Sequence, residues 1–161
     1  YAYWKTKGVK SIGLRLFTVY GSWGRPDMAP MLFANAAVKS KKIQVFNYGD
    51  QKRDFTHIND VVNCIFLLSE CFIEKIGKAE IVNIGNGSPT NLLDFIKTIE
   101  KSIGIKLLKE FVDSQLGDVA ETYADDTKLN LLIGDRNKTS LDHGVVEFIN
   151  WFKSYYEYTN H

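Results

Sequence analysis

Three segments combine turn residues, charged side chains and aromatic rings, a mixture typical of ligand-binding loops. They are residues 14–30 (LRLFTVYGSWGRPDMAP), 45–60 (VFNYGDQKRDFTHIND) and 117–125 (GDVAETYAD). The arginines could bind a ligand, but they could also serve the fold alone. Arg25 could pair with Asp27, and Arg53 could pair with Asp54 or Asp50. Exposed ion pairs of that kind contribute at most about 1 kcal/mol. Spacing alone leaves both interpretations open.

The other reactive side chains predict neither a metal site nor a disulfide. Cys64 and Cys71 are seven residues apart in a helical pattern, which separates them by about 10 Å along the axis. A disulfide needs Cα atoms within about 7 Å, so we expect reduced thiols and a cytoplasmic protein. The histidines are His57, His143 and His161. Together with the two cysteines, they lack the ligand spacing of a zinc site.

The composition is that of one ordinary globular domain. The chain has 161 residues, of which 45% are hydrophobic and 24% are charged. Its net charge of +1 offers no driving force for binding nucleic acid or an anionic membrane. No apolar run approaches the roughly 18 residues that a membrane span needs. We therefore expect neither nucleic acid nor a membrane among its partners.

The periodicity of apolar residues predicts a mixed α/β chain with short strands. Expected N-caps are Asn59 or Asp60, Asn91 and Ser140. Strands are expected at 12–17, 43–46, 53–56, 81–84 and 107–112, with a short extended piece at 122–124. Helices are expected at 1–7, 29–40, about 60–72, about 92–103, 126–132 and 140–158.

The glycine pattern does not predict a dinucleotide-binding loop. Gly85-x-Gly87 follows a strand, but a third glycine is missing and Pro89 stands two residues after Gly87. Residues 1–7 look like the end of a helix whose beginning is missing, and residue 1 is not methionine. The sequence therefore reads as a fragment.

Five motifs occur in one order along nearly the whole chain. They are L-R-x-F-T-V-Y-G, N-Y-G-x-x-x-R-D-F-T-x-I-x-D-V-V, N-I-G-x-G-x-P, G-D-V-x-x-T-Y-A-D and F-I-x-W-F-x-x-Y-Y. Together they resemble the extended short-chain dehydrogenase/reductase family of nucleotide-sugar epimerases and dehydratases. The stretch T-V-Y-G-x-W-G-R-P-D-M resembles the UDP-glucuronate 4-epimerase branch, although Ser22 stands where that family usually has proline.

The resemblance implies a role for each of several matched positions. Arg53 would grip a diphosphate, since a guanidinium can donate two hydrogen bonds to phosphate oxygens. Asp118 would accept from ribose hydroxyls. Phe46 would pack on uracil, with Gln44 at the edge of the base.

A second group of matched positions concerns the sugar and the cofactor. Thr18 and Arg25 would hold the carboxylate of a hexuronate. Phe17 and Val19 would lie against the nicotinamide of NAD. In this family NAD takes a hydride from C4 of the sugar, the 4-keto sugar turns over, and the hydride returns to its other face. A 4-keto uronic acid can lose carbon dioxide, so holding the carboxylate out of alignment would suppress decarboxylation.

The resemblance also implies what the chain lacks. Residues 1–161 would be a single C-terminal substrate-binding portion of an extended Rossmann-type epimerase, without the N-terminal NAD-binding portion. Tyr1 and Lys5 satisfy the Tyr-x-x-x-Lys spacing formally, but the matching pair of the family lies earlier on the same helix. We therefore expect no catalytic residue in the chain and no turnover.

Partners and alternatives follow from the same comparison. A UDP-sugar is the expected ligand. Strands 12–17 and 81–84 would form the edge of the missing parallel sheet, so a homodimer through these exposed edges is expected. The alternatives are a sibling dehydratase or decarboxylase, and a non-catalytic nucleotide-sugar-binding module.

Overall fold

A computed structural model describes residues 1–115 and 117–157 and confirms the mixed α/β class. The helices are α1 (Ala2–Lys7), α2 (Ala29–Val38), α3 (Ile58–Lys75), α4 (Leu92–Ile103), α5 (Thr127–Ile133) and α6 (Leu141–Tyr155), with a 3₁₀ turn η1 (Asn47–Gly49). The strands are β1 (Ser11–Leu16), β2 (Thr18–Tyr20), β3 (Lys42–Phe46), β4 (Lys52–Arg53), β5 (Phe55–His57), β6 (Ala79–Ile84), β7 (Thr90–Asn91) and β8 (Leu108–Val112). Among the described residues, no helix is both long and apolar enough to cross a bilayer.

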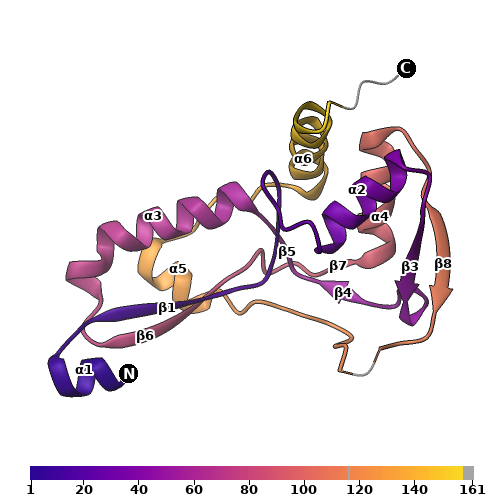
Figure 1. The fold of residues 1–161 in the computed structure, drawn as a ribbon. Helices are drawn as coiled ribbons and strands as arrows, with labels where there is room; N and C mark the ends of the chain where they lie inside the picture. Colours follow the sequence, from indigo (N-terminus) through magenta and orange to yellow (C-terminus); the bar gives the residue numbers. More distant parts are fainter. Residues whose placement is uncertain (116, 158–161) are drawn as a thin grey trace.

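Within the part of the chain that the structure describes, the strands form four separate pairs. β1 pairs with β6, β2 with β5, and β3 with β8, all in parallel, whereas β4 and β7 are antiparallel. Figure 1 shows an elongated molecule with α1, α3, α5, β1 and β6 at one end, and α2, α4, β3 and β8 at the other. The short strands β4, β5 and β7 lie between the two ends (Figure 1).

Two hydrophobic clusters of described residues form the cores of the molecule. In the larger one, α4 buries one stripe at helical spacing, formed by Leu92, Phe95, Ile96, Ile99 and Ile103. Phe95 stacks on Phe55 of β5 with ring centroids 3.8 Å apart. The smaller cluster joins α3, β6 and α5 through Val61, Cys64, Leu68, Val82, Ile84 and Leu129. Both cysteines are free thiols.

One predicted cap is wrong and two are confirmed. The cap of α3 is His57, without a side-chain hydrogen bond, and neither Asn59 nor Asp60 takes that position. The carboxylate of Asp60 instead accepts hydrogen bonds from the backbone N–H and the hydroxyl of Thr139, at 2.9 and 2.8 Å. Asn91 and Ser140 do cap α4 and α6.

The predicted strand at 53–56 and the extended piece at 122–124 also need correction. The first divides into β4 and β5 around Asp54. The second forms no strand, because the contact in this region is a single bridge between Lys52 and Glu121. The α3 helix continues past the predicted end at 72 to Lys75. Residue 158, the predicted end of the last helix, lies outside the described residues.

His57 links strand β5 to helix α6. Its ring is 3% exposed and lies 5.3 Å from the ring of Tyr20. Its Nε2 atom is 3.4 Å from a carboxylate oxygen of Glu147, which also contacts His143 at 3.3 Å. Burial lowers the pKa of His57, although the charges of Glu147 and Asp60 act in the opposite direction.

This lowered pKa predicts a loss of stability on mild acidification. The unfolded chain, with a histidine pKa near about 6.5, binds a proton more readily than the folded chain. The free energy of unfolding should therefore fall as the pH drops below about 6.5, by up to about 1.4 kcal/mol per pH unit. Urea unfolding between about pH 5 and 7.5 measures it. The slope should shrink in His57→Gln and persist in the exposed control His143→Gln; equal slopes in both would contradict the assignment.

Candidate functional site

Arg53 and Asp118 form the centre of the candidate site. The Nη2 atom of Arg53 lies 2.6 Å from Oδ1 of Asp118, and these side chains are 17% and 26% exposed. The structure thus joins two predicted binding residues that are 65 positions apart. The alternative partners considered for Arg53, Asp54 and Asp50, do not hold its guanidinium.

Backbone pairing explains how these two side chains meet. The N–H of Lys52 donates to the carbonyl of Ala120 at 2.9 Å, and the N–H of Thr122 donates back to the carbonyl of Lys52 at 3.1 Å. This single parallel bridge lays residues 120–122 beside Lys52 of β4. The guanidinium of Arg53 also donates to the carbonyls of Lys52 and Ala120, at 3.0 and 3.4 Å.

Gln51 is a site residue that the sequence reasoning missed. Its side chain accepts from Arg53 Nη2 at 3.3 Å and donates to the second carboxylate oxygen of Asp118. It is 7% exposed. The available signal was its position two residues before Arg53, because alternate residues of an extended chain face the same side.

The predicted cofactor and carboxylate contacts divide between two neighbouring pockets. Phe17, Val19 and Arg25 line a pocket of about 320 Å³, together with the loop 20–24 and Ile58. Thr18 lines another pocket, of about 630 Å³, which it shares with Phe17. Thr18 and Arg25 therefore do not line the same pocket.

Arg25 makes the ion pair that the sequence left as an alternative. Its Nε and Nη2 atoms donate to the two carboxylate oxygens of Asp27 at 3.1 and 2.5 Å. Both side chains are mostly exposed, at 73% and 65%. The hydrogen bond from Arg25 lowers the pKa of Asp27. The guanidinium is accessible to a ligand, but it is not preset toward Thr18.

Phe46 and Gln44 share a third pocket, between α2 and β3. This groove has a volume of about 610 Å³ and is also lined by Lys39, Lys41 and Lys42. Because the two residues are two apart on β3, their side chains leave the strand on the same face. Phe46 is partly exposed, so its ring is accessible to a flat base.

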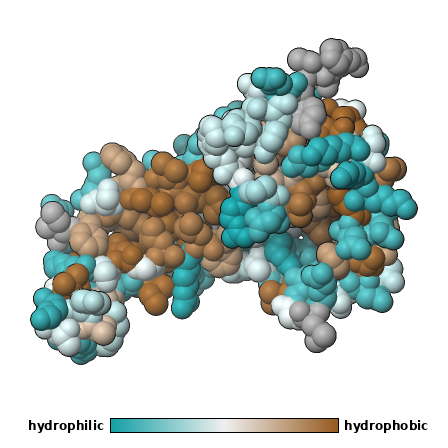
Figure 2. Space-filling view, viewed as in Figure 1, coloured by the Kyte–Doolittle hydropathy of each residue, from teal (hydrophilic) through white to brown (hydrophobic). Residues whose placement is uncertain are grey.

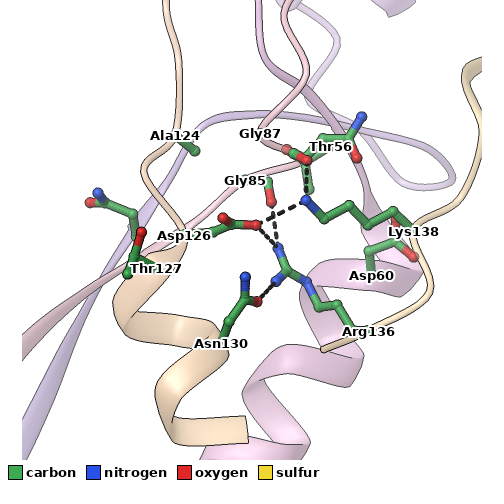
Figure 3. Close-up of polar contacts among 12 residues, drawn as sticks. Thr56, Asp60, Gly85, Gly87, Ala124, Asp126, Thr127, Asn130, Arg136 and Lys138 are labelled. Carbon is green, nitrogen blue, oxygen red and sulfur yellow. Dashed lines mark hydrogen bonds and ion pairs between the residues drawn. The ribbon is translucent and has the colours of Figure 1, made fainter. Parts of the chain in front are cut away.

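A partly buried polar cluster supports the turn after β6 (Figure 3). Arg136 donates to the carbonyl of Gly85 and to Asn130, both at 2.7 Å, and lies 3.3 Å from Asp126. Lys138 donates to the carbonyl of Asn86 at 2.5 Å and to Asp126 at 2.9 Å. Burial would raise the pKa of Asp126, but these two cations lower it overall.

Tyr1 and Lys5 show the geometry of an exposed helix surface. The ammonium of Lys5 lies 5.5 Å from the Tyr1 ring centroid and 4.9 Å from that of Trp4. Tyr1 is 74% exposed, and neither residue lines the three pockets above. Within residues 1–115 and 117–157, no group of three acidic, histidine or cysteine side chains could hold a metal ion.

A model of the NAD dependent epimerase/dehydratase family matches residues 1–85, which is more than half of the chain. The chain belongs to this family. Within the family, the "Uncharacterized protein MJ1055" of Methanocaldococcus jannaschii is 47% identical over 145 residues, covering 90% of this chain and 43% of that protein. UDP-glucuronate 4-epimerase 4 of Arabidopsis thaliana is 36% identical, covering 92% of this chain and 37% of that protein.

A solved structure of an epimerase shows the same arrangement of elements. The UDP-glucuronic acid 4-epimerase of Bacillus cereus, in complex with UDP-glucuronic acid and NAD, superposes with a TM-score of 0.88 at 32% identity. The match covers 96% of this chain and 49% of the B. cereus chain. The chain thus spans less than half the length of these relatives.

Proposed function

We propose that this chain binds the UDP-sugar in an NAD-dependent UDP-glucuronate 4-epimerase. The observation that carries the proposal is the contact between Arg53 and Asp118. It supports the proposal because a guanidinium can donate to a diphosphate and a neighbouring carboxylate can accept from ribose hydroxyls. The similarity to UDP-glucuronate 4-epimerases supports the choice of sugar.

Each predicted side chain has a part in this proposal. Arg53 donates to the diphosphate, and Asp118 accepts from the ribose hydroxyls. Phe46 packs on the uracil, with Gln44 at its edge. Thr18 and Arg25 reach the uronate carboxylate from two sides, which requires Arg25 to leave Asp27 when the sugar binds.

The residues present fit one end of NAD only. Phe17 and Val19 line a pocket that is largely apolar, and a nicotinamide ring could lie against it. When bound, NAD would supply the hydride acceptor for C4 of the sugar and the donor for its return. We propose that a preceding portion, absent from these 161 residues, holds the rest of NAD and supplies the catalytic Tyr-x-x-x-Lys. Residues 1–161 then act as a single substrate-binding portion without turnover, and the cytoplasmic location stays a prediction.

Calorimetric titration of this chain with UDP and, separately, with NAD tests the proposal. We expect weak binding of UDP and no detectable binding of NAD. UDP-glucuronate should bind at least as tightly as UDP, because the carboxylate adds contacts to Arg25 and Thr18. Binding of NAD without binding of UDP would overturn the assignment.

We also propose that two copies of the chain associate through the apolar side of α3 and β1. On α3, Val62, Ile65 and Phe66 are 56%, 41% and 57% exposed. Figure 2 shows apolar residues gathered over this end of the molecule. Among the described residues β1 pairs with β6 alone, so its second edge can pair with a strand of another copy.

Light scattering after size-exclusion chromatography measures this association. The chain should elute as a dimer at concentrations of tens of micromolar, and Phe66→Lys should shift it to a monomer by placing a charge on the apolar face. Leu108→Lys is the matched control, because Leu108 is 52% exposed on β8 at the other end of the molecule. A monomeric parent chain, or loss of the dimer in the control alone, would contradict the proposal.

A further inference from the structure

We infer that Asp54 is the positioning residue of the proposed UDP-sugar site. Its side chain does not enter the site, yet Asp54 bonds through its side chain and its backbone to the segments that carry Thr18 and Asp118. The expected effect of Asp54 on UDP binding rests on the proposed function, whereas its expected effect on the order of residues 117–125 does not. No role was assigned to Asp54 from the sequence beyond an ion pair with Arg53, which the structure does not contain.

The carboxylate of Asp54 collects backbone N–H groups from two distant segments. Its Oδ1 accepts from Asn86 at 2.7 Å, and its Oδ2 accepts from Gly87 at 2.8 Å and from Ala124 at 3.0 Å. The hydroxyl of Thr56 donates to Oδ1 at 3.3 Å. Asp54 is 0% exposed. Successive N–H groups such as those of Asn86 and Gly87 form a concavity that favours an anion.

The backbone of Asp54 makes two further connections. Its N–H donates to the hydroxyl of Thr122 at 3.1 Å, and its carbonyl accepts from the N–H of Thr18 at 3.2 Å. Thr18 belongs to the first chemistry-bearing segment and Thr122 to the third. Asp54, in the second, therefore bonds to both of them and to the turn after β6.

These bonds determine where Asp118 and Arg53 stand. Neighbouring residues of an extended chain face opposite sides, so Arg53 points to the site while Asp54 points inward. The bonds to Thr122 and Ala124 fix the segment that carries Asp118, four to six residues away. Without them, Asp118 is held beside Arg53 by the pairing between Lys52 and residues 120–122 and by its own contacts with Arg53 and Gln51.

The site of the carboxylate requires a group that only accepts hydrogen bonds. An asparagine has the same shape, but its amide nitrogen is a donor. It would face an N–H group of the chain, and at least one buried donor would lose its partner. Loss of a bond to a charged acceptor corresponds to about tenfold or more in an equilibrium constant.

The test compares Asp54→Asn with Glu100→Gln and uses two measurements. Glu100 is the matched control, because it is also a buried carboxylate, at 5% exposed, and accepts from the N–H of Leu107 at 2.8 Å, away from the site. Hydrogen exchange of residues 117–125 reports the segment without any ligand. Calorimetry with UDP reports the site.

We expect Asp54→Asn to speed exchange in residues 117–125 at least tenfold relative to the rest of the chain, and to weaken UDP binding about tenfold or more. Glu100→Gln should do neither. In an Asp118→Asn background, Asp54→Asn should cost less UDP affinity than in the parent chain, because its effect passes partly through Asp118. The milder Thr122→Val, which removes the acceptor of the Asp54 N–H, should change exchange and affinity in the same direction and serves if Asp54→Asn does not fold.

Different results would contradict the proposed function and the positioning role of Asp54. If the parent chain binds no UDP, the proposed function is wrong, and the exchange measurement still tests the role of Asp54. If exchange in residues 117–125 is unchanged in Asp54→Asn and Thr122→Val, the inference is wrong. Loosening of the segment with full UDP affinity would also overturn it, because Asp54 would then serve the fold alone.

Discussion

Arg53→Ala should weaken UDP binding by about 100-fold, since two hydrogen bonds to a charged diphosphate contribute about 3 kcal/mol together. Arg53→Lys should recover only part of this loss, because an ammonium cannot reproduce the two parallel bonds of a guanidinium. Uridine lacks the diphosphate, so its weaker binding should change little in either variant. Calorimetry with UDP and uridine separates these cases.

The neighbouring Lys52 supplies the control for this prediction. Its side chain is exposed, and it leaves the strand on the face opposite to Arg53. Lys52→Ala should therefore retain UDP affinity within about twofold. An equal loss in Lys52→Ala and Arg53→Ala would mean that general positive charge, rather than the Arg53 guanidinium, attracts the nucleotide.

Gly85→Ala should destabilise the fold by about 2–3 kcal/mol. A Cβ atom on Gly85 would overlap the Cβ of Ala124 and lie 3.1 Å from a carboxylate oxygen of Asp54. Neither neighbour is the free end of a flexible side chain, so the segments themselves would have to separate. Urea unfolding at a fixed pH measures the change.

Gly13→Ala is the matched comparison, because neither Gly13 nor Gly85 has a positive φ. Its added Cβ would meet its nearest neighbours at 3.7 and 3.8 Å, which is ordinary contact. We expect a change within about 0.5 kcal/mol there. Similar unfolding midpoints for the two variants would show that residues 85 and 124 can move apart at little cost.

The sequence was sufficient to predict those structural features that depend on residues close together along the chain. The α4 helix is an example, since its apolar spacing, the Asn91 cap and the Gly104 stop are all local signals. The prediction of Asp60 as a cap of α3 was wrong, because its carboxylate accepts hydrogen bonds from Thr139, which is 79 positions away. The local spacing of residues does not indicate so distant a partner. The short strands β4 and β5 likewise depend on what packs beside them.

The candidate site shows the same limit. Residue type and spacing could not decide between a binding role and an ion pair for Arg25 or Arg53, and only the resemblance selected among them. The contact between Arg53 and Asp118 depends on the backbone hydrogen bonds that join Lys52 to residues 120–122. Thr18 and Arg25 line different pockets. The shape of these pockets depends on how the chain folds, so the sequence pattern could not reveal this separation. Gln51 and Asp54 matter through distant partners, and so escaped notice.

The Arg53–Asp118 pair has a consequence for selectivity. In the free protein the guanidinium is already matched by a carboxylate held within the chain. A small anion such as sulfate or phosphate must compete with that carboxylate and gains nothing elsewhere, so it should bind poorly. In the proposed site, a nucleotide would contact both members of the pair at once, Arg53 through its phosphates and Asp118 through its hydroxyls. If the chain binds a nucleotide as proposed, the carboxylate of Asp118 should favour ligands that carry both a phosphate and a hydroxyl group at the matching separation.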